Sequence, residues 1–177
     1  IQWQTKQDAN LEHLLCGQCE GLISDWEGYA KRIFWEKENC TIKGNGYLSV
    51  VPAFEVYENL DYRRIKLFQL SLIWRASVSS IQMFRNVRLG KHEEKIGKML
   101  LTGDPGNFDD YPCAMISTRE KSGIHPGLIL QPKRTRVNGT HSTNFYIAGI
   151  VFAFYISKHN VPSVITKLAI QQNGTLI

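Results

Sequence analysis

Apolar side chains recur at helical spacing in three stretches of the chain's first hundred residues. Across residues 20–37 they fall every three or four positions with charged residues between them, which predicts an amphipathic helix. Residues 61–87 carry the strongest apolar stripe, which predicts a long central helix that begins at an Asp61 N-cap and ends before Gly90. Residues 91–101 predict a third, shorter helix that a Gly- and Pro-rich turn closes.

The pattern changes toward strands in the second half of the chain. Runs of β-branched and aromatic residues predict strands there, and one more short strand is predicted just before Pro52. Gly149 interrupts the longest run and indicates a bulge or a bend. Helices early and antiparallel strands toward the C-terminus predict an α+β fold rather than a doubly wound α/β fold. The predicted strands are residues 47–51, 113–118, 128–131, 144–157 and 164–170.

Composition narrows the class of protein. A chain of 177 residues that is 43% hydrophobic can bury a core, which excludes a disordered segment. The longest apolar stretch, residues 145–156, is shorter than the roughly 20 residues that a membrane-spanning helix needs. No charged-then-apolar leader is visible at the start of the chain. We therefore expect a cytoplasmic protein without a membrane partner.

Basic charge is concentrated in two segments of the chain. The net charge is +5, and basic side chains outnumber acidic ones across residues 61–100 and again across residues 119–136. Lys133, Arg134 and Arg136 form the densest basic run, which we expect to lie in a loop and to contact phosphates of DNA or RNA. A solvated basic face without a partner is the alternative interpretation.

The spacing of Cys16 and Cys19 gives the chain its clearest chemical motif. Two residues between cysteines let both sulfurs face one metal ion, so the pair predicts half of a tetrahedral zinc site. Cys40, Cys113 and His13 are the candidates for further ligands, although none has the matching spacing. Buried structural cysteines or a redox pair are the alternatives, and the redox interpretation is disfavoured because no βαβ pattern surrounds the motif.

Residues 8–20, which run directly into the first predicted helix, resemble the second half of an HNH, or ββα-metal, nuclease finger. Cys16 and Cys19 match the second zinc knuckle of that family. Asn10 corresponds to the loop asparagine, one residue further from the cysteines than in the family pattern. Glu20 stands where the family has a histidine or asparagine ligand of the catalytic metal ion. The resemblance covers residues 8–35 and divides the chain into a knuckle and helix at 1–40 and an α+β body at 41–177.

The resemblance implies an HNH-like metal-dependent nuclease, or a degenerate remnant of one, acting on DNA or RNA in bacterial or phage defence or mobile-element biology. Zinc would be structural, and Mg²⁺ or Mn²⁺ would be catalytic with Glu20 and Asn10 in the active site. The first knuckle and the water-activating histidine of the family are not among these residues, so either they precede Ile1 or the finger is retained for structure alone. The alternative is a non-catalytic binding module with a structural zinc knuckle, acting as a homodimer or on a protein or nucleic-acid partner.

A third hypothesis places an enzyme site between residues 92 and 110. His92 with the two glutamates that follow it, and the aspartates Asp104, Asp109 and Asp110, could bind a divalent ion or transfer protons. A helix N-terminus and a Pro- and Gly-rich loop explain the same residues structurally, and no spacing there is diagnostic.

Overall fold

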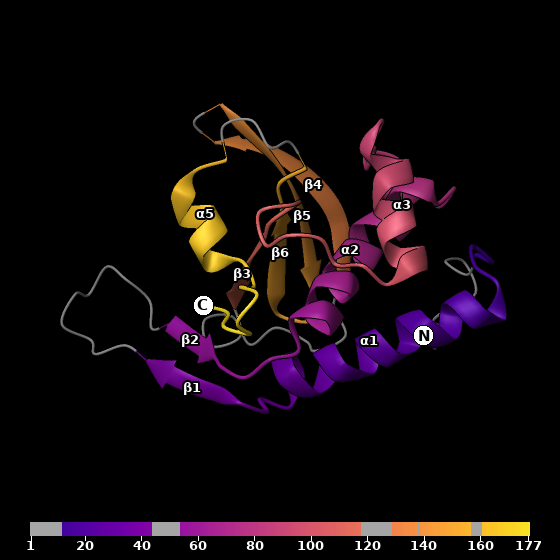
Figure 1. Cartoon of the computed structure of the whole chain (residues 1–177). Coiled ribbons are helices and arrows are strands. Elements are labelled where there is room, and N and C mark those ends of the chain that lie inside the picture. Colours follow the sequence, from indigo (N-terminus) through magenta and orange to yellow (C-terminus); the bar gives the residue numbers. More distant parts are fainter. Residues whose placement is uncertain (1–11, 44–53, 118–128, 138, 157–160) are drawn as a thin grey trace, which may run out of the picture.

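The chain folds as a mixed α+β protein in the computed structural model, which describes residues 12–43, 54–117, 129–137, 139–156 and 161–177 (Figure 1). Its helices are α1 (Gly17–Trp35), α2 (Tyr62–Val78), α3 (His92–Thr102) and α5 (Ser163–Leu168), with a 3₁₀ turn η2 (Gln82–Phe84) after α2. Its strands are β1 (Cys40–Lys43), β2 (Phe54–Tyr57), β3 (Cys113–Ser117), β4 (Ile129–Val137), β5 (Thr140–Ile147) and β6 (Ile150–Phe154).

The last four strands form one antiparallel sheet in the order β3-β6-β5-β4, while β1 and β2 pair separately. The predicted α+β class and the antiparallel C-terminal strands are therefore confirmed. The run predicted as one strand at 144–157 is instead the β5–β6 hairpin. Ala148 and Gly149 turn the chain with positive φ angles of 47° and 85°. A two-residue hairpin turn of this hand requires positive φ at both positions, which a glycine supplies readily.

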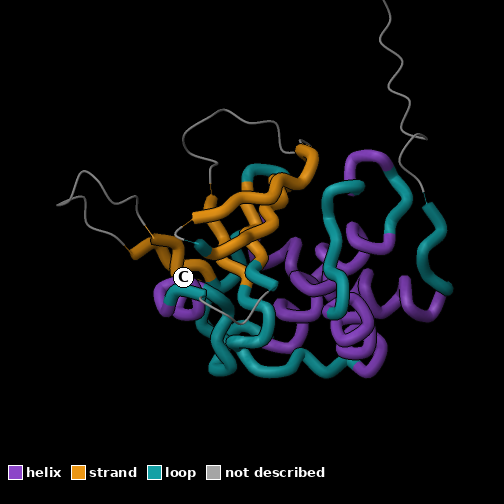
Figure 2. Tube along the Cα trace, turned by 90° about the horizontal axis from the view of Figure 1, so that it is seen from above, coloured by secondary structure: helices purple, strands orange, loops and turns teal. Residues whose placement is uncertain are grey.

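The hydrophobic core lies between the helices and the sheet. Most of the helical segments gather on one side of the strands (Figure 2). Phe34 of α1 packs against Phe68 of α2 and Phe152 of β6, in both cases with ring centroids 6.4 Å apart. This aromatic cluster joins α1 and α2 to the centre of the sheet. No helix among the described residues combines the length and the apolar character that crossing a membrane requires.

The helix α2 begins where it was predicted but ends nine residues early. The Asp61 carboxylate accepts the Arg64 N–H at 3.0 Å, as an N-cap does. After Val78 the backbone becomes extended, with ψ of 142° at Ser79. Its hydroxyl accepts the Ile81 N–H at 3.1 Å, a local bond that competes with helix continuation. Gly90 is therefore not the stop of this helix and belongs to the turn before α3.

Two further predictions about strands and loops are wrong. Lys133, Arg134 and Arg136 lie on β4, paired with β5, and not in a loop. The ladder shifts register between Leu130 and Lys133, and this irregularity places the intervening proline where it need not donate a ladder hydrogen bond.

Residues 164–170 were predicted as a strand but form most of α5, which packs against β3. A short β-branched run fits either structure, and tertiary packing decides between them. The strand predicted at 47–51 lies outside the described residues.

Candidate functional site

Cys16 and Cys19 lie at the N-terminus of α1, which begins three residues earlier than predicted. Cys16 is the N-cap residue, with extended backbone at φ −77° and ψ 159°, and Cys19 is in the first turn. The backbone N–H of Cys19 and then its thiol donate to the Cys16 sulfur, and these bonds lower the pKa of the Cys16 thiol. The hydrogen bond to Cys16 raises the pKa of Cys19. The two sulfurs therefore lie within hydrogen-bonding reach of each other, and Cys16 is the one that ionises first.

This pair fits two of the four ligands of a tetrahedral zinc site. Cys16 is exposed and Cys19 is partly exposed, so both sulfurs are accessible to a metal ion. Within the ranges that the structure describes, no three His, Cys, Asp or Glu side chains come together as a metal-binding group. Any further ligands must therefore come from elsewhere: from undescribed residues, from a second chain or from a segment outside this sequence.

The two cysteines considered as further ligands do not lie near the pair. Cys40 is in β1, beyond the far end of the 19-residue helix α1, which is about 28 Å long. Cys113 is fully buried on β3, where burial raises its pKa and the neighbouring Lys66 opposes that rise. A thiol without access to solvent that resists ionisation is a poor zinc ligand. His13 lies on the surface, three residues before Cys16.

Next to the cysteine pair is a cavity of about 790 Å³ between the start of α1, α2, η2 and the strands β4 and β5. Its walls are mostly apolar, and its polar groups include Glu12, Glu20, Glu27 and Arg75. Arg75 donates to the Glu27 carboxylate, and this ion pair links α2 to α1.

Glu12 and Glu20 differ in how they are held. The Glu12 carboxylate accepts the Ser79 hydroxyl at 2.5 Å and the Ser80 N–H at 2.9 Å, and these bonds, the Ser79 hydroxyl first, lower its pKa. Glu20 is exposed in the first turn of α1, and no hydrogen bond or ion pair from another described residue engages its carboxylate. Glu20 therefore directly follows Cys19 in the first turn of α1, with an exposed side chain. Asn10 lies outside the described residues.

A second cavity, of about 620 Å³, lies on the other side of the contact between η2 and β4. The described residues that line it are polar or basic, apart from one proline: Arg85, Asn86, Gln131, Pro132, Lys133 and Arg134. Lys133 and Arg134 were predicted as phosphate contacts from the basic run, whereas Arg85 and Asn86 were not, because both fall at the end of the predicted long helix. Nothing in the local sequence indicates that they meet β4.

The two cavities are neighbours, because the same two segments contribute to both. Phe84 lines the first cavity and Arg85, the next residue, lines the second. Likewise Ile129 lines the first and Gln131 lines the second. An acidic cavity that borders the cysteine pair therefore adjoins a basic groove. We call this second cavity, with its six lining residues, the basic groove.

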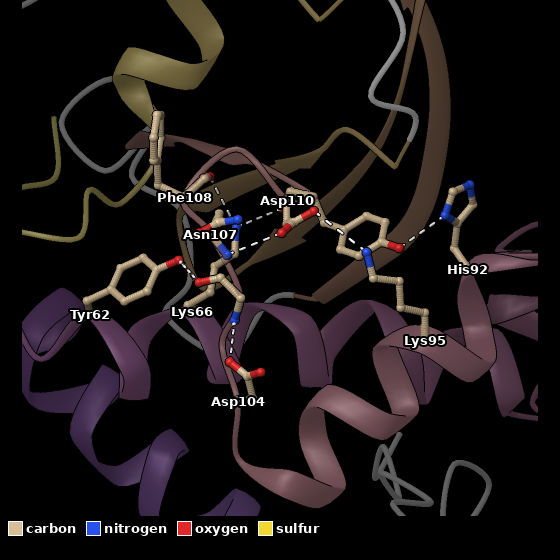
Figure 3. Close-up of polar contacts among 10 residues, drawn as sticks. Tyr62, Lys66, His92, Lys95, Asp104, Asn107, Phe108 and Asp110 are labelled. Carbon is tan, nitrogen blue, oxygen red and sulfur yellow. Dashed lines mark hydrogen bonds and ion pairs between the residues drawn. The ribbon is translucent and has the colours of Figure 1, made fainter.

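Three residues of the third hypothesis, His92, Asp104 and Asp110, belong to a separate polar cluster around the loop that follows α3 (Figure 3). Glu93 lies outside this cluster and accepts the Ser77 hydroxyl at 2.5 Å. Lys66 is fully buried and donates to the carbonyls of Tyr111 at 3.2 Å and Phe108 at 3.5 Å. Burial lowers the pKa of Lys66 to about 8. The Tyr62 hydroxyl donates to the Gly106 carbonyl at 2.9 Å. These contacts hold the loop against α2. In them the Lys66 ammonium and the Tyr62 hydroxyl both donate to backbone carbonyls of the loop.

The acidic and imidazole groups of that cluster are likewise engaged within it. The Asp110 carboxylate accepts the Asn107 N–H at 3.2 Å and lies 3.7 Å from the Lys95 ammonium. His92 Nδ1 is 3.1 Å from the Tyr111 hydroxyl. Asp104 accepts the Gly106 N–H at 3.0 Å, which shapes the loop (Figure 3). The arrangement is that of a loop anchor.

Comparison with known proteins gives no match: neither a protein-family model, nor a curated protein, nor a solved structure resembles this chain.

Proposed function

We propose that this chain belongs to an HNH-like metal-dependent nuclease that hydrolyses phosphodiester bonds of DNA or RNA. The observation that carries the proposal is the adjacency of the two cavities. Glu20 and Gly17, which lie next to the two cysteines in the sequence, line one cavity, and a groove whose cations form no ion pair with a described carboxylate adjoins it. A nuclease needs both parts, because a polyanion must be held while charge develops at one phosphate.

In this proposal each candidate residue has a separate role. Cys16 and Cys19 supply two thiolate ligands to a structural zinc ion, and Glu20 supplies a carboxylate oxygen to a catalytic Mg²⁺ or Mn²⁺ ion. A bound divalent ion offsets the negative charge that develops on the phosphate and on the leaving oxygen. The carboxylates at the first cavity would repel a phosphodiester when no cation is present, so we expect cleavage there to depend on a metal ion. Lys133, Arg134 and Arg136 of β4 bind phosphates of the nucleic-acid backbone.

The zinc part is tested by elemental mass spectrometry on protein purified without chelator. We expect about one zinc ion bound at the cysteine pair, and a loss of that zinc in the variant Cys16→Ser/Cys19→Ser. The matched control is Cys113→Ser, because that thiol is buried on β3 and distant from the pair. Equal zinc content in the double variant and the wild-type protein would contradict the assignment of the pair as ligands.

The catalytic part is tested by cleavage of labelled DNA and RNA with Mg²⁺ or Mn²⁺. We expect Glu20→Gln to lower the cleavage rate at least tenfold while the fold is retained. Glu36→Gln is the matched control, because Glu36 is the exposed C-cap residue at the opposite end of the same helix. Wild-type cleavage by Glu20→Gln would remove Glu20 from the mechanism.

A specific observation favours a second candidate, the non-catalytic binding module. No histidine is among the described residues that line either cavity, so this part of the chain supplies no imidazole to activate water. In that case the cysteine pair stabilises the start of α1, and the basic groove binds nucleic acid without cleaving it. Binding without cleavage under all metal conditions would select this candidate.

A further inference from the structure

We propose that the basic groove is a nucleic-acid backbone site and that Arg85, Asn86 and Gln131 belong to it together with Lys133 and Arg134. This inference rests on the proposed function for its substrate class, and it adds to that function a binding surface that works without metal. Arg85 and Asn86 follow η2, and the other residues lie on β4, more than forty positions later. The groove is therefore a product of the fold.

Charge is the first argument for a polyanionic ligand. Among the residues that the structure describes, three cations line the groove and no acidic residue does. Arg88 and Arg136, both exposed, follow closely on the same two segments and extend the basic surface. Among the residues that the structure describes, no carboxylate forms an ion pair with the three groove cations. A concave surface of one charge sign raises the local concentration of the opposite ion, so it selects for anions.

The identity of the side chains favours phosphodiesters among the anions. Arginine presents a planar set of donors that binds two oxygens of one phosphate, and Arg85 and Arg134 supply two such groups. The amides of Asn86 and Gln131 add neutral donors that can bond to phosphate or sugar oxygens. Pro132 is buried between Gln131 and Lys133 and stiffens the wall that carries these donors.

The geometry of β4 favours a polymer over a single small anion. Alternate residues of a strand are roughly 6.8 Å apart, so Arg134 and Arg136 repeat along the strand at a spacing close to that of successive phosphates in an extended nucleic-acid chain. β4 is the last strand in the order β3-β6-β5-β4, so no other described strand pairs with its outer edge. Phe84 and Ile129 line the first cavity and Arg85 and Gln131 line the groove, so a chain bound in the groove can extend toward the cavity that Glu20 lines.

The test is fluorescence anisotropy with a labelled single-stranded oligonucleotide and its duplex, with EDTA present and over a series of salt concentrations. The groove variant is Arg85→Gln/Lys133→Gln/Arg134→Gln. The matched control, Lys31→Gln/Lys98→Gln/Lys167→Gln, removes the same charge from exposed positions on other helices. Circular dichroism and thermal unfolding establish that both variants are folded.

We expect the groove variant to bind at least tenfold more weakly than the wild-type protein and the control less than threefold more weakly. The slope of log K against log salt should become shallower by about 2 for the single strand, because each lost phosphate contact contributes about 0.7. Equal weakening by the two variants would overturn the proposal, since binding would then follow net charge alone. Displacement of the oligonucleotide by millimolar inorganic phosphate at constant ionic strength would overturn it as well, because the groove would then be a small-anion site.

The same measurements separate this inference from the nuclease proposal. Metal-free binding that depends on the groove, with no cleavage when Mg²⁺ or Mn²⁺ is added, would support the groove and refute the nuclease. Cleavage that the groove variant retains at the wild-type rate and KM would refute the groove and support the nuclease. A wild-type protein that binds neither oligonucleotide at low salt would refute both.

Discussion

Replacing Lys66 by methionine should change how the stability of this protein depends on pH. Lys66 is fully buried on α2, and its ammonium donates to the carbonyls of Tyr111 and Phe108. Burial lowers its pKa from 10.5 to about 8. Methionine has nearly the same length and volume but neither titrates nor donates, so the substitution removes the charge with little change in packing.

The lowered pKa sets the sign and the size of the effect. Between about pH 8 and pH 10.5 the unfolded chain holds the Lys66 proton and the folded chain releases it, so the wild-type protein gains stability as pH rises. Over one and a half pH units this gain is about 2 kcal/mol, at about 1.4 kcal/mol per unit. The methionine variant lacks it. The stability advantage of wild type over variant should therefore widen by about 2 kcal/mol from pH 8 to about pH 9.5.

Near pH 7 the two proteins should differ less. The charged lysine there carries a burial penalty of about 3 kcal/mol, which methionine relieves. The variant leaves the buried Tyr111 carbonyl without its donor, which costs about 1–3 kcal/mol. These effects oppose each other, so we expect the free energies of unfolding at pH 7 to agree within about 2 kcal/mol.

Urea unfolding at about pH 7, 8 and 9.5, with a reductant to protect the thiols, measures the effect. The pKa of Cys113 and that of Tyr62 are both raised by burial, but both groups remain in the variant and largely cancel in the comparison. Lys98→Met, at an exposed position on α3, serves as the control and should show a constant difference from wild type. A difference between wild type and Lys66→Met that stays constant across this range would refute the burial argument.

Two further substitutions test the fold. Gly174→Ala should destabilise the protein by at least about 2 kcal/mol, because Gly174 has φ of +79° and an added Cβ would lie 2.3 Å from the Leu60 carbonyl oxygen. An unchanged thermal midpoint would show that the C-terminal segment is not held against Leu60. Asp61→Ala should cost about 1 kcal/mol through loss of the N-cap of α2, with Asp61→Asn retaining most of the stability. Equal urea midpoints for the alanine and asparagine variants would contradict this role.

Local pattern was sufficient for much of the helical part of the molecule. The 3.6-residue spacing predicted α1 and α3 to within three residues, and an aspartate at the right position predicted the start of α2. These features depend on interactions within about four residues, which a single sequence displays. The end of α2 was missed because Glu12, far away in the sequence, bonds to Ser79 and Ser80 just after the last turn.

Some residues of the candidate site could likewise be predicted from the local sequence, and others could not. The cysteine spacing and Glu20 were identified from neighbouring residues, and the structure places all three at the start of α1. Cys40 does not join them because the length of α1 separates it from the pair, and Cys113 does not because it is buried on the sheet. The spacing of cysteines in the sequence does not show either fact. Arg85 and Asn86 could not be predicted as groove residues, because the sequence around them does not show that they pack beside β4.

Residue order thus specified the periodic faces, the caps and the paired thiols, because each results from chemistry between near neighbours. The folded chain specified the short α2, the helical state of α5 and the meeting of η2 with β4. Each of these depends on contacts between segments far apart in sequence, whose free energy outweighs the small local preferences of the residues involved. The basic groove is of this second kind, since η2 and β4 form it only when they pack together.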